Sequence, residues 1–201
     1  MKKFELTTES ITFLGRTLFR IKALISFGNV KAGELGGYIE KEGNLSHEGN
    51  AWVYDNAWVC GDAWVSGDAR VYDNAWVYDN ARVSGDARVS GNARVSGDAW
   101  VSGDARVSGD AWVSGDARVS GNAWVSGDAD IATISGFGSE YRTTTFFRTK
   151  NDEIAVKCGC FYGTLAEFRE KVKKTHGDSK YAKEYLMIAD LMEMHFRGEE
   201  E

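Results

Sequence analysis

A chain of 201 residues can bury a core of its own and is typical of one elongated domain with capping segments. Charged residues make up 27% of it and the formal net charge is -6, which disfavours nucleic acid and anionic membranes as partners. The 3 cysteines are too few and too odd in number for a disulfide framework, so we expect a reducing compartment, the cytoplasm.

The N-terminal segment, residues 1–50, lacks a regular repeat. Its basic start is followed by no apolar run, and no later stretch reaches the ~18 apolar residues of a membrane span, so we expect neither export nor a membrane anchor. Aliphatic residues stand at scattered positions, among them Leu35, Ile39 and Leu45. We interpret the segment as irregular first rungs and an N-terminal cap, because the exposed end of a solenoid needs a cover.

Residues 51–130 repeat with a period of six and without a single insertion. The unit is Ala-[Trp/Arg]-Val-[Ser/Tyr/Cys]-[Gly/Asp]-[Asp/Asn], and the series of aliphatic anchors ends at Ile131. The anchors before it are Val53, Val59, Val65, Val71, Val77, Val83, Val89, Val95, Val101, Val107, Val113, Val119 and Val125. A strand puts Ala and Val on one face and the intervening Trp or Arg on the other, whereas a helix would scatter the valines. Each unit therefore predicts a short strand followed by a Gly/Asp/Asn corner.

Strands this short cannot fold alone, so the units must stack into a solenoid in which each backbone pairs with the coils above and below. An aliphatic residue followed four positions later by a small one, as in Val53 and Ala57, resembles the hexapeptide-repeat superfamily. The resemblance covers about 80 of the 201 residues. It implies a mainly β fold, a left-handed parallel β-helix shaped as a triangular prism, with three hexads in each coil. The regular region, residues 51–132, would then be roughly 20 Å long.

The C-terminal segment, residues 133–201, predicts a small α+β cap. Residues 143–150 and 153–161 are rich in β-forming side chains on either side of an Asn-Asp pair, which is typical of a β-hairpin. The hairpin would begin the cap directly after the last repeat.

Two helices are predicted to follow the hairpin. Thr164 and Glu167 have the spacing of a capping box that begins a helix extending to about Lys174, and a second helix is predicted over about residues 180–196. The whole cap resembles the C-terminal module of uncharacterised proteins of bacteriophages and prophages, a family that brings no established activity. The segments that carry this resemblance are Phe146-Phe147-Arg148, Cys158-Gly159-Cys160-Phe161 and Thr175-His176-Gly177-Asp178.

Hexapeptide-repeat proteins are most familiar as acyltransferases, in which a coil histidine acts as general base and acyl-CoA lies between two subunits. Here His47, His176 and His195 all lie outside the regular coils, and the loop insertion that builds the substrate pocket of the family is missing. We therefore predict no enzyme, no catalytic residue and no cofactor. The alternative is a degenerate relative of the acyltransferases, and His47 is the only residue that supports it.

The cysteines and the corner residues are the candidates for metal binding. Cys158 and Cys160 lie two apart on a predicted strand and so point the same way, with His176 following. Zinc would need a fourth ligand, and C-x-C lacks the two-residue knuckle of common structural sites. We interpret the pair as buried thiols that pack the cap and Cys60 as inert. No coil offers the oxygen cluster that Ca²⁺ uses, so we predict no metal.

The position before each valine carries tryptophan or arginine through the repeat, and it contains all 7 tryptophans. With three hexads per coil, residues 18 apart stack, which predicts three columns. The first contains Trp64, Arg82, Trp100 and Arg118, the second Trp52, Arg70, Arg88, Arg106 and Trp124, and the third Trp58, Trp76, Arg94, Trp112 and Asp130. Alternating indoles and guanidinium groups favour cation–π stacking, at ~0.5–1 kcal/mol per exposed pair.

Three roles are open for these columns: structural stabilisation, a protein–protein interface, and capture of a phosphate-bearing ligand or nucleic acid. Trp and Arg are enriched at binding hot spots, which favours an interface, including a homo-oligomer such as a dimer or trimer. Six arginines against twelve aspartates over residues 51–130 make nucleic acid an unfavourable ligand and leave acidic DNA mimicry as a further alternative.

We therefore expect a non-enzymatic binding protein that acts through its Trp/Arg-lined faces. The resemblance of the cap implies a phage or prophage origin, and a host component, such as a defence system, as the target. The candidate binding residues are Trp64, Arg82, Trp100, Arg118, Arg88, Arg106, Arg94 and Trp112.

Overall fold

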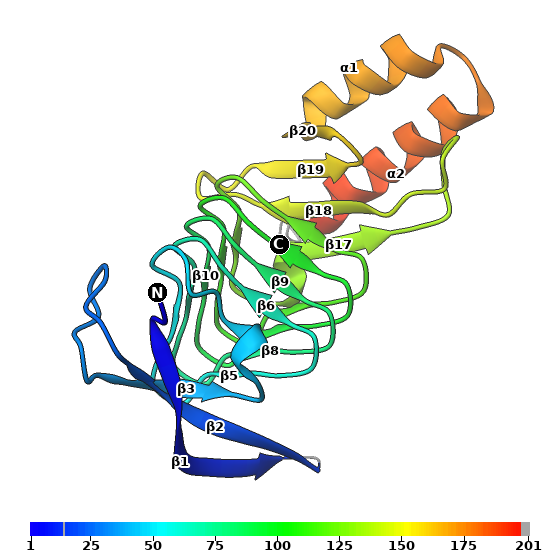
Figure 1. The fold of residues 1–201 in the computed structure, drawn as a ribbon. Helices are drawn as coiled ribbons and strands as arrows, with labels where there is room; N and C mark the ends of the chain where they lie inside the picture. The colour runs from blue at the N-terminus through cyan, green and yellow to red at the C-terminus, as the bar shows by residue number, and fades with distance from the viewer. Residues whose placement is uncertain (14, 198–201) are drawn as a thin grey trace.

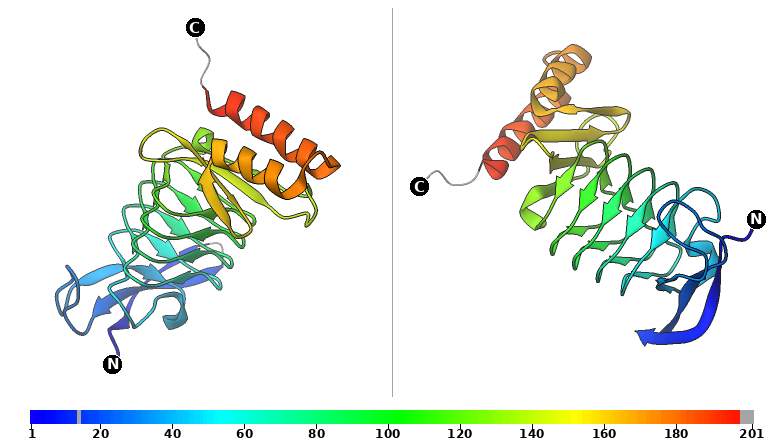
Figure 2. Two further views of the ribbon diagram at one scale, coloured as in Figure 1. Left: turned by 90° about the horizontal axis from the view of Figure 1, so that it is seen from above. Right: turned by 90° about the vertical axis from the view of Figure 1, so that its left-hand side faces the viewer.

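The computed structural model describes residues 1–13 and 15–197 and shows a mainly β protein built on a parallel β-solenoid (Figure 1). An antiparallel hairpin lies at the N-terminal end of the solenoid, and a small sheet with two helices lies at the C-terminal end. The coils stack along one axis between these two caps (Figure 2).

Each hexad of the repeat forms one strand of two residues, as its period predicts. The strands are β4 (Trp52–Val53), β5 (Trp58–Val59), β6 (Trp64–Val65), β7 (Arg70–Val71), β8 (Trp76–Val77), β9 (Arg82–Val83), β10 (Arg88–Val89), β11 (Arg94–Val95), β12 (Trp100–Val101), β13 (Arg106–Val107), β14 (Trp112–Val113), β15 (Arg118–Val119) and β16 (Trp124–Val125). Each strand from β4 to β13 pairs in parallel with the strand three places further along, so that Val53 lies beside Val71 and Val71 beside Val89. The predicted coil of three hexads is confirmed.

The strands form three sheets. One has the order β16-β13-β10-β7-β4, the second β15-β12-β9-β6, and the third β1-β2-β3-β5-β8-β11-β14, in which the N-terminal cap continues the solenoid. These orders reproduce the predicted columns except at Asp130, which lies in the short helix η2 (Asp128–Asp130). The column ends there because Gly127 is extended and makes no corner.

The interior of the solenoid contains the valines and the first-position alanines. All thirteen repeat valines are fully buried, and together with the alanines they belong to one continuous cluster. Burial of a valine side chain contributes ~1.5–3 kcal/mol as an upper estimate.

The corners use backbone conformations that suit glycine and aspartate. Gly85 has a φ of 67°, and a Cβ there would lie 2.9 Å from the backbone nitrogen of Gly103 one coil further on. Asp73 takes the same left-handed conformation at an equivalent corner, with a φ of 60°, because short polar side chains tolerate it. Side chains also link successive corners, as where Asn92 Nδ2 donates to Asp110 Oδ1 at 3.0 Å.

The N-terminal cap is an antiparallel arrangement followed by irregular rungs. It consists of β1 (Phe4–Phe13), β2 (Arg16–Ala23), β3 (Leu35–Ile39) and the short helix η1 (Glu42–Asn44). Ile39 pairs with Val59 and Leu45 bridges to Val65, and both are buried as first-rung anchors should be. The prediction is wrong for Leu35, which is 50% exposed because it begins β3 before the chain enters the coil.

The C-terminal cap begins with a four-stranded antiparallel sheet. Its strands are β17 (Ile131–Ile134), β18 (Thr144–Arg148), β19 (Ile154–Cys158) and β20 (Phe161–Thr164), and β18 and β19 are the predicted hairpin. One face of this sheet covers the last coil, since Phe147 belongs to the core of the solenoid. The other face packs on the helices, where Phe146 is buried.

The two predicted helices are present as α1 (Leu165–His176) and α2 (Lys180–Phe196). The capping box is confirmed: Thr164 Oγ1 accepts from Glu167 N at 3.2 Å, and Glu167 Oε2 accepts from Thr164 N at 2.8 Å. In the described part of the chain, neither helix is long and apolar enough to cross a bilayer.

Candidate binding site

The column on β6, β9, β12 and β15 keeps its outward side chains exposed along its whole length. It contains Trp64, Arg82, Trp100 and Arg118, in parallel register from one coil to the next, and is called the Trp100 face below. Trp64 is 44% exposed and Trp100 40%, and both arginines are exposed. The structure thus brings these four predicted residues together on one uncovered surface.

The other two columns are partly covered by the N-terminal cap. Trp52 lies in register with Arg70 in the outward column, as predicted, but it is fully buried because the ring of Phe27 packs edge-on against it at 5.4 Å between centroids, so it cannot belong to an exposed face. Trp58 and Trp76 stack at 5.0 Å and are half-buried beneath Phe13, which lies 4.8 Å from Trp58 and 4.9 Å from Trp76. The hairpin folds back over these tryptophans because their large apolar rings are the surface it can bury.

The remaining candidates of these two columns lie beyond the reach of the hairpin. Arg88 and Arg106 are adjacent and exposed on the sheet of β4, and Arg94 and Trp112 are adjacent and exposed on the sheet of β5. Arg88 also lines a shallow hollow between the corners of two coils, together with Arg70. Neither column combines two exposed tryptophans with two exposed arginines in neighbouring coils.

The predicted stacking of guanidinium groups on indoles is confirmed at three places. Arg118 lies over Trp100 at 5.6 Å from its centroid, and the equivalent pairs are Arg94 over Trp76 at 5.1 Å and Arg106 over Trp124 at 5.4 Å. The repeat arginines contact no carboxylate at ion-pair distance within residues 1–13 and 15–197. Within these residues the guanidinium groups are therefore not held in ion pairs, and three of them contact an indole ring instead.

The indole of Trp100 has a fixed orientation. Its Nε1 donates to Ser84 Oγ at 3.0 Å, and Trp112 makes the same bond to Ser96 Oγ at 3.1 Å. The indole N–H is thereby satisfied within the solenoid, so that a ligand would meet the ring and not the donor.

A cleft of about 670 Å³ lies where the Trp100 face meets the C-terminal cap. Its charged and aromatic lining consists of Trp100, Asp116 and Arg118 from the solenoid, Glu140, Tyr141 and Arg142 from the loop between β17 and β18, and Lys157 from β19. A second hollow of about 420 Å³ lies along the same face and is lined by Arg82, Trp100 and Arg118 together with Asp62, Asn80 and Asp98. The two hollows share Trp100 and Arg118, so they adjoin on the same face.

The cations of the cleft come from three separate segments. Arg118 N donates to Thr145 Oγ1 at 3.0 Å, which fixes β15 against β18. Lys157 pairs with Thr145 across β18 and β19 and so lies on the sheet face turned to the solenoid. Arg142 makes one exposed ion pair, to Glu140 Oε2 at 3.4 Å. The lining therefore carries three cations against two carboxylates.

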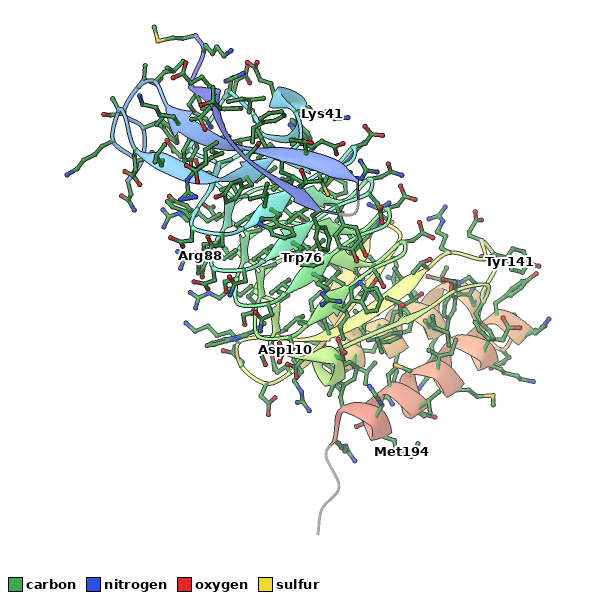
Figure 3. All side chains as sticks on the ribbon, turned by 90° about the horizontal axis from the view of Figure 1, so that it is seen from below. Lys41, Trp76, Arg88, Asp110, Tyr141 and Met194 are labelled. Atoms are coloured by element: carbon green, nitrogen blue, oxygen red, sulfur yellow. The ribbon has the colours of Figure 1, made fainter. Side chains whose placement is uncertain are left out.

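Tyr141 has an unusual backbone conformation in the loop that walls the cleft. Its φ is 51°, and the other non-glycine residues with positive φ in the described chain are all aspartates. A bulky side chain in this region is strained, and such strain clusters at binding sites. The side chain is 68% exposed and stands at the edge of the cap beside the helices (Figure 3).

Sequence reasoning missed Tyr141, Arg142 and Lys157. All three lie outside the repeat, and nothing in their spacing indicates that the cap sheet brings them to the last coils.

His47, the one histidine considered for catalysis, forms hydrogen bonds inside the N-terminal cap. His47 Nδ1 accepts from the backbone N–H of Lys3 at 3.1 Å, Nε2 lies 2.7 Å from Glu42 Oε1, and the ring stacks on Phe4 at 4.4 Å. This hydrogen bond with His47, together with Lys2, lowers the pKa of Glu42. Both ring nitrogens are therefore used in holding the cap together.

The two cysteines of the C-terminal cap do not share a strand, so that prediction is wrong. β19 ends at Cys158, and the left-handed turn at Gly159 carries Cys160 away to an exposed position. Cys158 Sγ accepts from Thr144 Oγ1 at 3.2 Å. Residues 1–13 and 15–197 contain no group of three His, Cys, Asp or Glu side chains arranged to hold a metal.

Comparison with known families agrees with the observed solenoid. The family model described as YdcK Beta solenoid repeat matches residues 63–79, 75–90, 87–103, 99–115 and 111–127. The repeat region is therefore similar to that β-solenoid family, while both caps lie outside the match. No curated protein matches the chain.

Proposed function

We propose that the protein is a non-enzymatic binding module that contacts a partner through the Trp100 face. The observation that carries the proposal is the continuous exposure of two tryptophans and two arginines that contact no carboxylate in the described chain. Trp and Arg provide large contact areas and charge-assisted hydrogen bonds, which is why they dominate binding hot spots. A rigid solenoid holds them in fixed positions, so little conformational entropy is lost on binding.

The proposal includes a protein of the host as the partner and a left-handed coil of the hexapeptide-repeat type. The resemblance of the C-terminal cap to phage-encoded proteins supports a host protein as the partner. Coils of 18 residues without insertions support a coil of the hexapeptide-repeat type. Self-association through the same face is the simplest way in which a homo-oligomer would form.

The proposal is tested by capture from host lysate with two matched double variants. Trp64→Ala with Arg82→Glu changes the Trp100 face, whereas Trp112→Ala with Arg94→Glu makes the same changes on the sheet of β5. We expect the first variant to lose the partner protein that the wild type and the second variant retain, with all three folded. Equal capture by both variants would contradict the proposal.

The alternative of a degenerate acyltransferase relative makes a different prediction. Acyl-CoA would then raise the melting temperature in a saturable way, and His47→Ala would abolish the effect. A binding module without catalytic ancestry should show no such dependence on His47, because its ring nitrogens hold Lys3 and Glu42.

A further inference from the structure

We infer that the cleft between the Trp100 face and the C-terminal cap binds a nucleoside phosphate. The inference deepens the proposed binding function and rests on it, since the cleft continues the same face. Its own evidence, however, comes from the cap residues Tyr141, Arg142 and Lys157, which the test of the proposed function leaves unchanged.

The dimensions of the cleft suit a small molecule. Its volume of about 670 Å³ lies within the range of roughly 300–1,000 Å³ that is typical of ligand pockets. The walls come from the solenoid, from the loop between β17 and β18 and from β19, so a ligand would be held from several sides.

The charges of the cleft fit phosphate groups. Arg118 and Lys157 form no ion pair within the described residues, and the single ion pair of Arg142, to Glu140, is exposed. Guanidinium groups bind phosphate with two parallel hydrogen bonds, and a lysine ammonium adds a compact positive charge. Three cations from separate segments of chain line the cleft against two carboxylates, which leaves the lining with a net positive charge.

The other lining groups indicate that the ligand is more than a phosphate. Tyr141 offers an exposed ring face on which a planar base can stack, and Trp100, which has Arg118 over one face of its ring, adds further aromatic surface to the lining. Asp116 and Glu140 are acceptors that repel free phosphate but accept hydrogen bonds from ribose hydroxyls. A nucleoside phosphate supplies the base, the sugar hydroxyls and the anionic groups that these residues would bind.

The strain at Tyr141 supports the same assignment. A positive φ in a tyrosine costs free energy that an unliganded loop could avoid with glycine or aspartate. Retaining an exposed tyrosine there is explained if its ring contacts a ligand.

The experiment is isothermal titration calorimetry of the full chain with ADP, pyrophosphate and adenosine. We expect ADP to bind with one site and more tightly than either fragment. Lys157→Ala and Arg142→Ala should each weaken ADP and pyrophosphate about tenfold or more, whereas Tyr141→Ala should weaken ADP and leave pyrophosphate unchanged. A loss of ADP affinity with unchanged pyrophosphate affinity would show that Tyr141 stacks on the base, because general damage to the cap would weaken both ligands.

The matched control is Arg94→Ala, because Arg94 occupies the same repeat position as Arg118 and also stacks on a tryptophan, yet lies outside the cleft. Its ADP affinity should equal that of the wild type. The inference would be overturned if the protein did not bind ADP, or if Arg94→Ala lost as much ADP affinity as the cleft variants. It would also be overturned if the protein bound the acidic peptide hexaglutamate saturably and did not bind ADP. None of these outcomes would alter the capture result with the Trp64/Arg82 variant, so the two proposals fail separately.

Discussion

Val89 lies at the centre of the solenoid, and its substitution tests whether the valine column provides the stability of the fold. The side chain is fully buried on β10, with Val71 in the preceding coil and Val107 in the next. The backbone groups around it are used between coils, as where Tyr72 N donates to the carbonyl of Val89 at 3.0 Å. A new polar group at this position would therefore lack a free partner.

Three substitutions at Val89 separate the cost of lost apolar burial from the cost of burying a polar or charged group. Val89→Ala removes two methyl groups, which at about 0.8 kcal/mol each plus the cavity left behind predicts a loss of about 2–3 kcal/mol. Val89→Thr keeps the shape and buries an unpaired hydroxyl, at a cost of about 1–3 kcal/mol. Val89→Asp buries an unpaired carboxylate and should prevent soluble expression.

The assay for the alanine and threonine variants is urea unfolding followed by circular dichroism, in which the midpoint should fall while the m-value stays constant. Arg88→Ala is the matched control, because the neighbouring side chain is exposed and its removal should change stability by about 0.5 kcal/mol or less. A threonine variant as stable as this control, or an aspartate variant that is soluble and unfolds cooperatively, would refute the inward assignment of the valines.

Deletion of one whole coil, residues 83–100, should leave a folded protein, whereas deletion of residues 83–88 alone should rotate all later columns by one sheet and detach the cap. Equal melting temperatures for the two deletions would contradict an 18-residue coil. Trp100→Ala should lower stability by about 1–2 kcal/mol in urea unfolding, because it removes one cation–π contact and one hydrogen bond, to Ser84 Oγ. A loss above about 4 kcal/mol would show that the indole is part of the core. Burial lowers the pKa of Lys3 to about 8, an effect that the charge of Asp68 only partly offsets. Between about pH 8 and 10.5 Lys3 is therefore protonated in the unfolded state and largely neutral in the folded state. Over this range the free energy of unfolding of the wild type should rise by up to about 1.4 kcal/mol per pH unit compared with that of the Lys3→Met variant. Parallel pH profiles of the wild type and that variant would contradict this.

The parts of the fold that the sequence predicts are those that depend on local spacing. Valine at every sixth position and Gly or Asp at each corner determine strand, turn and coil within 18 residues, so the three columns follow from the sequence alone. The burial of Trp52 does not follow, because it depends on Phe4 and Phe27 of the N-terminal cap, which lie more than twenty residues earlier in the chain and pack on the first coil. The repeat pattern marks Trp52 and Trp100 as equivalent, and only the packing of the cap distinguishes them.

The same reasoning explains why the cleft could not be predicted. Arg118 was recognisable from the repeat, whereas Tyr141, Arg142 and Lys157 reach it only through the antiparallel pairing of β18 with β17 and β19. A regular solenoid presents nearly the same surface at every coil, so it cannot by itself define one specific site. A unique site needs a break in the repetition, and the chain provides one where the Trp100 face meets the loop between β17 and β18. The N-terminal cap covers Trp52, Trp58 and Trp76 of the other two columns, so the face that leads into this cleft is the one whose four Trp and Arg side chains are all exposed.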